Sequence, residues 1–161
     1  MNSTCIDMLI NVSVNYPELN GIKYQTDEET IALKFALKGM KTGDHLPGLQ
    51  MKLRKCYHLY HTLYHTQPKM FNISVNELEG IVFFTLYRDQ ATLTEEEIDL
   101  YINIMKEDYD HYLVKDNINI KTIDTYKQSL KKNLLHRICK SRNCNSFWAF
   151  RQGGKVFVLN K

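Results

Sequence analysis

The chain lacks any long apolar segment. No run approaches the roughly 18 uninterrupted apolar residues that a transmembrane helix needs. The first basic residue is Lys23, so the N-terminus has no positively charged region of the kind that opens a secretory signal peptide. These absences predict a cytoplasmic protein without a membrane partner.

Closely paired cysteines are also missing. The four cysteines, Cys5, Cys56, Cys139 and Cys144, include no C-x-x-C pair, and scattered cysteines in a cytoplasmic chain are usually free thiols. His136 precedes the last two, but H-x-x-C-x-x-x-x-C is not a standard finger spacing and needs a fourth ligand from elsewhere. This cluster therefore predicts no zinc site.

Signature motifs of enzymes are absent as well. The sequence has no phosphate-binding loop, dinucleotide fingerprint, H-E-x-x-H or nucleophile elbow. In YHLYHTLYHT, His61 and His65 lie one turn apart and could share a metal ion. Histidines that alternate with tyrosines, including His58, are more often part of an amphipathic packing surface. We therefore predict no catalytic residue, no metal and no cofactor, in a protein that is not an enzyme.

Charge is divided unevenly along the chain. Residues 117–161 hold ten lysines and arginines against the single acid Asp124, a net charge of +9. Residues 1–116 hold 11 bases against 17 acids, a net charge of −6. This asymmetry indicates an anionic partner for the C-terminal part, although its basic face could also pair with the acidic half of the same chain.

The first 70 residues are expected to form a small mixed α+β region. Residues 5–14 fit a strand or a short helix equally well. Strands are predicted at 21–25 and 30–39, where Ile31, Leu33, Phe35 and Leu37 alternate with alanine and lysine. A helix follows at about 48–66, with an apolar stripe of Leu49, Leu53, Cys56, Tyr60, Leu63 and Tyr64.

From residue 74 onward the patterns predict three helices and a hairpin. Ser74 and Glu77 fit a capping box opening a helix, although IVFFTLY in it also fits a buried strand. Thr94 and Glu97 fit a second capping box, opening a helix that extends to about residue 113. Asn119 caps a third, at about 120–138. Two strands around Gly153-Gly154, at 147–159, fit a hairpin.

This order of elements resembles the winged helix-turn-helix DNA-binding superfamily over about residues 74–161. The stretch NINIKTIDTYKQSLKKNL is similar to the turn and recognition helix of LuxR/NarL-type output domains. The matching positions are Asn119, Thr122, Ile123, Leu130 and Leu134. The hairpin FRQGGKVFVL looks like a wing. The resemblance implies two units, a dimerisation or effector region at 1–70 and a DNA-binding domain at 74–161.

The outer face of the predicted helix 120–138 also suits DNA. Opposite the Ile123–Leu130–Leu134 stripe lie only basic or hydrogen-bonding side chains. Such side chains read base edges in the major groove or contact phosphates, and Arg151 lies at the tip of the expected wing. The predicted DNA-binding residues are Lys121, Thr122, Thr125, Gln128, Ser129, Lys131, Lys132 and Arg151.

The sequence therefore predicts a DNA-binding transcriptional regulator. It would place helix 120–138 in the major groove of double-stranded DNA and act as a homodimer on two half-sites. The alternative is a winged-helix interaction module, for instance within replication or mobile-element machinery, that docks an acidic protein partner.

Overall fold

The computed structural model describes residues 3–41, 43, 45–115, 132, 146–153 and 155–160. In chain order the elements are α1 (Ser3–Asn15), β1 (Gly21–Gln25), β2 (Thr30–Lys38), α2 (Leu46–Leu63), β3 (Phe71–Leu78), β4 (Ile81–Asp89), α3 (Glu95–Tyr109), β5 (Ser146–Gln152) and β6 (Lys155–Asn160). The described part of the chain is therefore α+β, in agreement with the sequence.

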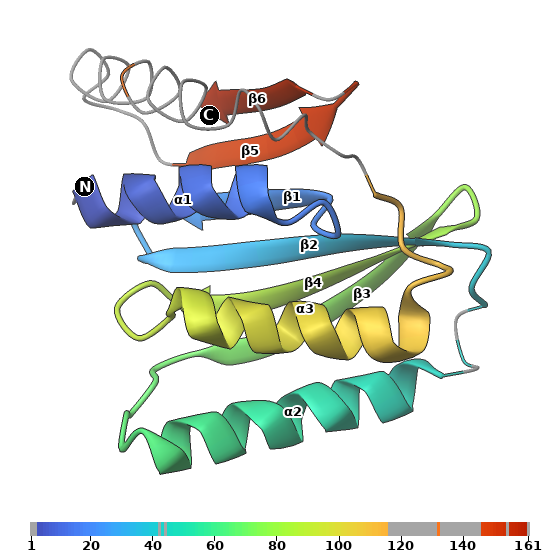
Figure 1. The fold of residues 1–161 in the computed structure, drawn as a ribbon, viewed down its shortest axis with the longest axis horizontal. Coiled ribbons are helices and arrows are strands. Elements are labelled where there is room, and N and C mark those ends of the chain that lie inside the picture. Colours follow the sequence, from blue (N-terminus) through green and yellow to red (C-terminus); the bar gives the residue numbers. More distant parts are fainter. Residues whose placement is uncertain are drawn as a thin grey trace.

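These six strands form one antiparallel sheet in the order β3-β4-β2-β1-β5-β6 (Figure 1). β1 and β2 are the strands predicted at 21–25 and 30–39, and β5 and β6 form the predicted C-terminal hairpin. However, β5 also pairs with β1. The hairpin is thus an edge of the main sheet instead of a separate wing, and strands from both 1–70 and 74–161 lie in that sheet.

Residues 71–89 form the β3–β4 hairpin, so the helix predicted from Ser74 and Glu77 is wrong. The turn residues Glu79 and Gly80 have φ values of 51° and 77°. Positive φ at both central residues is the geometry of a type I′ hairpin turn. Every second side chain of β4 is fully buried: Val82, Phe84, Leu86 and Arg88. This period of two, together with pairing to β2, overrides the local capping pattern.

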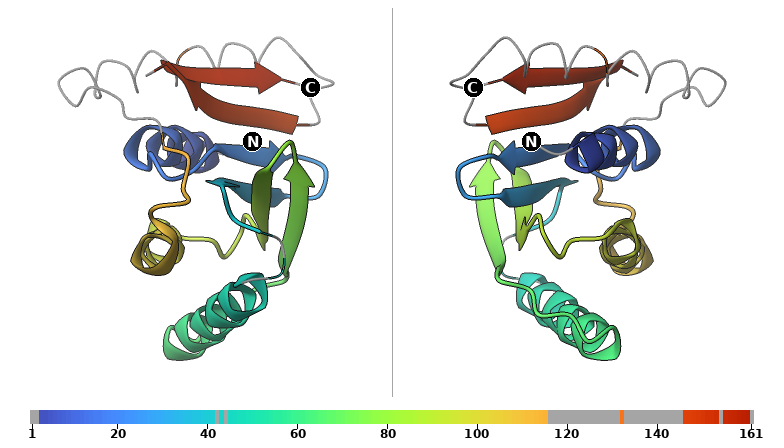
Figure 2. Two further views of the ribbon diagram at one scale, coloured as in Figure 1. Left: turned by 90° about the vertical axis from the view of Figure 1, so that its right-hand side faces the viewer. Right: turned by 90° about the vertical axis from the view of Figure 1, so that its left-hand side faces the viewer.

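The helices cover one face of the sheet (Figure 2). The ambiguous segment at 5–14 is helical, and α1 packs Ile6, Leu9 and Ile10 into the core. α3 lies next to it, and α2 packs beside α3, where the Tyr57 ring stacks on Phe71 of β3 with 4.2 Å between ring centroids. The central strands β2 and β4 supply the opposite side of this core.

The buried side of α2 differs from the predicted stripe. Leu49, Leu53 and Tyr60 are buried as expected, but the buried side continues through Tyr57 and His61. The other three predicted positions are more open: Cys56 is half-buried, and Leu63 and Tyr64 are exposed. The difference arises because His61 contacts a buried polar group on the core side of α2. Cys56, Leu63 and Tyr64 therefore form a second apolar stripe, which faces outward.

That polar group is a buried ion pair between β4 and α3. Arg88 Nε donates to Glu97 Oε1 at 2.7 Å and Arg88 Nη2 to Glu97 Oε2 at 3.0 Å. Tyr101 Oη donates to the same carboxylate at 2.5 Å, and His61 Nε2 of α2 lies 3.2 Å from Glu97 Oε2. Thr94 caps α3 through the Glu97 amide, as predicted. The Glu97 carboxylate, however, joins β4, α2 and α3 instead of completing a capping box.

Candidate functional site

The face of the sheet opposite the helices is open in the described part of the chain (Figure 2). The strand register places its side chains in neighbouring rows. One row contains Leu159, Trp148, Lys23, Ala32, Tyr87 and Asn72. The next contains Phe157, Phe150, Gly21, Lys34, Thr85 and Ser74. Lysines and aromatic rings thus lie on one face of the sheet. The residues that alternate with them along each strand point to the other face and form the core.

A cavity of about 240 Å³ lies on this face over β1 and β2. Small residues, Gly21 and Ala32, line it at the centre, and larger side chains from the flanking strands line it further out: Lys23, Lys34, Tyr87, Trp148 and Leu159. Apolar and hydrogen-bonding groups are therefore both available to a ligand that lies flat on the sheet.

The absence of a side chain at Gly21 allows the Trp148 indole to lie across β1. A Cβ built at Gly21 would lie 2.6 Å from Trp148 Nε1 and 3.3 Å from the Ala149 carbonyl oxygen. The first distance is shorter than real Cβ contacts, so any other residue would move the indole. The position of this ring therefore depends on the glycine.

Lys34 lies between aromatic rings on the same face. Its Nζ is 4.3 Å from the Phe83 ring centroid and 5.5 Å from that of Trp148, within the range of cation–π attraction. Partial burial lowers the pKa of Lys34 from its ordinary value. An anionic ligand on this face would approach a cation that is already partly desolvated, which strengthens the attraction.

Negative charge on this face is nearly absent within the six described strands. Lys23, Lys34, Lys38 and Lys155 occupy positions on it, and Asp89 is the sole acid at such a position. The Asp89 carboxylate accepts hydrogen bonds from the backbone amides of Lys69 and Met70, both at 3.1 Å, and from Thr92 Oγ1 at 2.6 Å. The acidic turn 27–29 lies beyond one end of the face.

Further aromatic surface continues toward the β6 edge. The rings of Trp148 and Phe150 are 5.7 Å apart, and those of Phe150 and Phe157 are stacked at 5.5 Å with an interplanar angle of 19°. Phe157 and Leu159 are among the exposed large apolar residues. Aromatic faces beside lysines, with the one acid already hydrogen-bonded, suit ligands that combine flat rings with negative charge.

No protein-family model, curated protein or solved structure matches the chain.

Most of the predicted DNA-binding residues lie outside the described part of the chain. This applies to Lys121, Thr122, Thr125, Gln128, Ser129 and Lys131. Lys132 is described and is exposed. Arg151 lies on β5 rather than at the hairpin tip, and its half-buried guanidinium donates to the Leu19 carbonyl oxygen. Arg151 thus contacts the protein itself, and the DNA-binding role of the residues outside the described part stays a prediction.

The histidine cluster has a structural explanation at one position. His61 Nδ1 lies 2.5 Å from Thr66 Oγ1, and its Nε2 lies between Arg88 and Glu97. α2 ends at Leu63, and His65 has a left-handed φ of 53°, so the two histidines are not on one continuous helical face. Among the described residues no three His, Cys, Asp or Glu side chains are placed to hold a metal. No described helix is long and apolar enough to span a membrane.

The sequence interpretation missed Lys34, Tyr87 and Trp148. The relevant pattern was present, because alanines and lysines alternate with the large apolar residues of the 30–38 strand. The sequence could not show that no described element covers this side of the sheet, nor that Tyr87 and Trp148 lie in the same row.

Proposed function

We propose that the protein binds single-stranded nucleic acid on the open face of its sheet. The observation that carries the proposal is the combination on that face of lysines and aromatic rings around the Gly21–Ala32 cavity, with its one acid already hydrogen-bonded. Proteins that bind single strands combine a positive surface that follows the backbone with aromatic side chains on which bases stack.

The spacing of the rings suits unstacked bases. Trp148 and Tyr87 lie in one row and are separated by three strand spacings, or about 14 Å at roughly 4.8 Å each. Two bases could each stack on one ring without stacking on each other. Lys23 and Lys34 lie between the two rings and would contact the connecting phosphates.

A single strand is favoured over the alternatives by its exposed base faces. A duplex hides those faces in its own stack, so it could use the lysines but not the rings. An acidic protein partner would likewise leave the rings largely unused. The major-groove role of residues 120–138 in a transcriptional regulator stays a prediction, because all of those residues except Lys132 lie outside the described part.

Fluorescence provides a direct test, since Trp148 is the only tryptophan in the sequence. A dye-labelled oligothymidylate and a duplex of equal length should be titrated at several salt concentrations. We expect tighter binding of the single strand, quenching of Trp148 emission, and an affinity that falls with salt. Trp148→Leu should weaken single-strand binding about 5- to 150-fold, the equivalent of one lost stacked base at roughly 1–3 kcal/mol.

Removing single lysines tests whether binding depends on this face or on positive charge elsewhere on the surface. Lys34→Ala should weaken single-strand binding and reduce its salt dependence. Lys106→Ala is the matched control, because Lys106 lies on α3, across the molecule, where its Nζ is 3.6 Å from Glu18 Oε1. Equal effects of the two substitutions, or binding without a change in Trp148 emission, would overturn the proposal. Tighter duplex binding unaffected by Lys34→Ala would instead support residues 120–138.

A further inference from the structure

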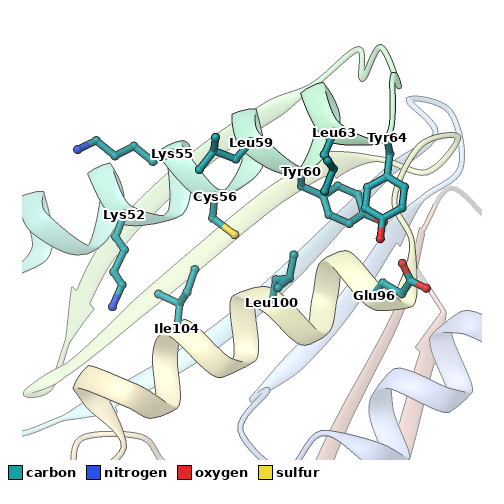
Figure 3. Close-up of a pocket in the computed structure, with 10 residues that line it drawn as sticks. All are labelled: Lys52, Lys55, Cys56, Leu59, Tyr60, Leu63, Tyr64, Glu96, Leu100 and Ile104. Carbon is teal, nitrogen blue, oxygen red and sulfur yellow. The ribbon is translucent and has the colours of Figure 1, made fainter.

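A second open surface lies on the outer side of the helices. A groove with a volume of about 580 Å³ runs between α2 and α3 (Figure 3). Cys56 of α2 and Leu100 and Ile104 of α3 point into it (Figure 3). This groove is the outward stripe of α2 described above, completed by one side of α3.

The groove exposes more apolar surface than isolated surface residues would. Leu59 and Leu63, one helical turn apart, are 71% and 73% exposed, and Tyr64 and Leu100 beside them are also exposed. Isolated exposed apolar residues are ordinary, but a contiguous group bordered by charges marks an interaction surface. The spacing of Leu59 and Leu63 suits contact with another helix.

The charged side chains that line the two ends of the groove are of opposite sign. At one end Lys52 Nζ binds Glu107 and Asp108 at 3.0 and 2.8 Å, and Lys55 lies exposed beside it. At the other end Glu96 is exposed next to Tyr64 (Figure 3). The charged residues that line the groove are therefore Lys52 and Lys55 at one end and Glu96 at the other, and Lys55 is the lining lysine that Glu107 and Asp108 do not bind.

We propose that this groove binds a second copy of the chain in a two-fold dimer. A two-fold axis near Leu59 would make the two α2 helices antiparallel, because Lys55 and Leu63 lie one turn before and one turn after it. Lys55 of each copy would then approach Glu96 of the other, while the leucines of both copies meet at the centre. A surface with opposite charges at its two ends is complementary to itself in this arrangement.

The dimer is independent of the proposed nucleic-acid site. The groove lies on the helical side of the molecule and the cavity on the opposite face of the sheet. Association through the helices would leave both sheet faces open and directed away from each other. Failure of one proposal therefore leaves the other intact.

Charge reversal gives a test specific to the two-fold arrangement. The mass of the parent chain should be measured by sedimentation equilibrium at micromolar concentration and should be twice 19.0 kDa. Lys55→Glu alone places two acids against each other, and Glu96→Lys alone places two lysines against each other. Each should weaken self-association by at least about tenfold. Mixed in equal amounts, the two variants should associate, because both contacts are then attractive.

Two further substitutions complete the experiment. Leu59→Glu at the centre should abolish the dimer, while His58→Glu, on the same helix but outside the groove, should leave it unchanged. Far-ultraviolet circular dichroism checks that each variant is folded. A parent that is monomeric at these concentrations, single charge variants that still dimerise, or a mixture that stays monomeric would each overturn the proposal.

Discussion

Replacement of Glu97 with alanine should strongly destabilise the protein. The substitution removes both carboxylate oxygens that Arg88 contacts, at 2.7 and 3.0 Å, and also the acceptor of the Tyr101 hydroxyl. Arg88 and Glu97 are both 0% exposed, so water cannot replace the lost partner, and Arg88 is left with Asp89 as its carboxylate partner. Breaking a buried pair by removing one member costs about 3–5 kcal/mol, a large part of the roughly 5–15 kcal/mol of a typical domain.

Urea denaturation at pH 7, followed through Trp148 emission at one fixed protein concentration, measures this loss. The control is Glu107→Ala on the same helix. Glu107 is an exposed partner of Lys52, which keeps Asp108, so the cost should stay below about 1 kcal/mol.

The double substitution Arg88→Met with Glu97→Leu tests the reason for the loss. If the cost comes from the buried charge that Glu97 leaves behind, replacing both members by apolar residues of similar size should recover part of the stability, while Asp89 loses its ion pair with Arg88. A Glu97→Ala variant that loses no more stability than Glu107→Ala would refute the reasoning. A double variant as unstable as Glu97→Ala would show that packing or the loss of the Arg88–Asp89 pair, and not the Arg88 charge, dominates.

Two other predictions concern Gly21 and Asp89. Gly21→Val should displace the Trp148 indole, which a Cβ would approach to 2.6 Å, and should shift Trp148 emission and weaken oligothymidylate binding in the same titration. For Asp89, burial alone would raise the pKa of the carboxyl, but hydrogen bonds from Thr92 and the Met70 amide and the charge of Arg88 hold it below its ordinary value. Asp89 therefore stabilises the fold above its unfolded-state pKa of about 3.9, and this contribution is lost as pH falls through the lower folded-state pKa. Asp89→Asn should be less stable than the parent at neutral pH, with a smaller difference at pH 3, in urea titrations at both pH values.

Patterns confined to one segment predicted much of the fold. The alternation in 30–38, the cap at Thr94 and the turn at Gly153 identified β2, the start of α3 and the β5–β6 hairpin because each depends on neighbouring residues. The β3–β4 hairpin was missed because Ser74 and Glu77 satisfy a helix cap locally. Pairing of β4 with β2, far away in sequence, decides that segment.

The candidate site was less predictable than the fold. Trp148 and Tyr87 lie in one row only because β5 pairs with β1, β1 with β2, and β2 with β4. No local pattern encodes that chain of pairings. The outward stripe of α2 was missed for a related reason, since the predicted stripe assumed that all apolar residues of the helix face one core.

The position of β1 has a consequence for synthesis of the chain. One edge of β1 can pair with β2 as soon as β2 has been synthesised. The other edge has no partner until β5 has been synthesised. At roughly 5–20 residues per second, that edge stays open on the ribosome for about 6–25 seconds. During this interval its free amides and carbonyls can pair with a neighbouring nascent chain. Nascent chains halted before residue 146 should therefore aggregate more readily than those that have passed residue 152.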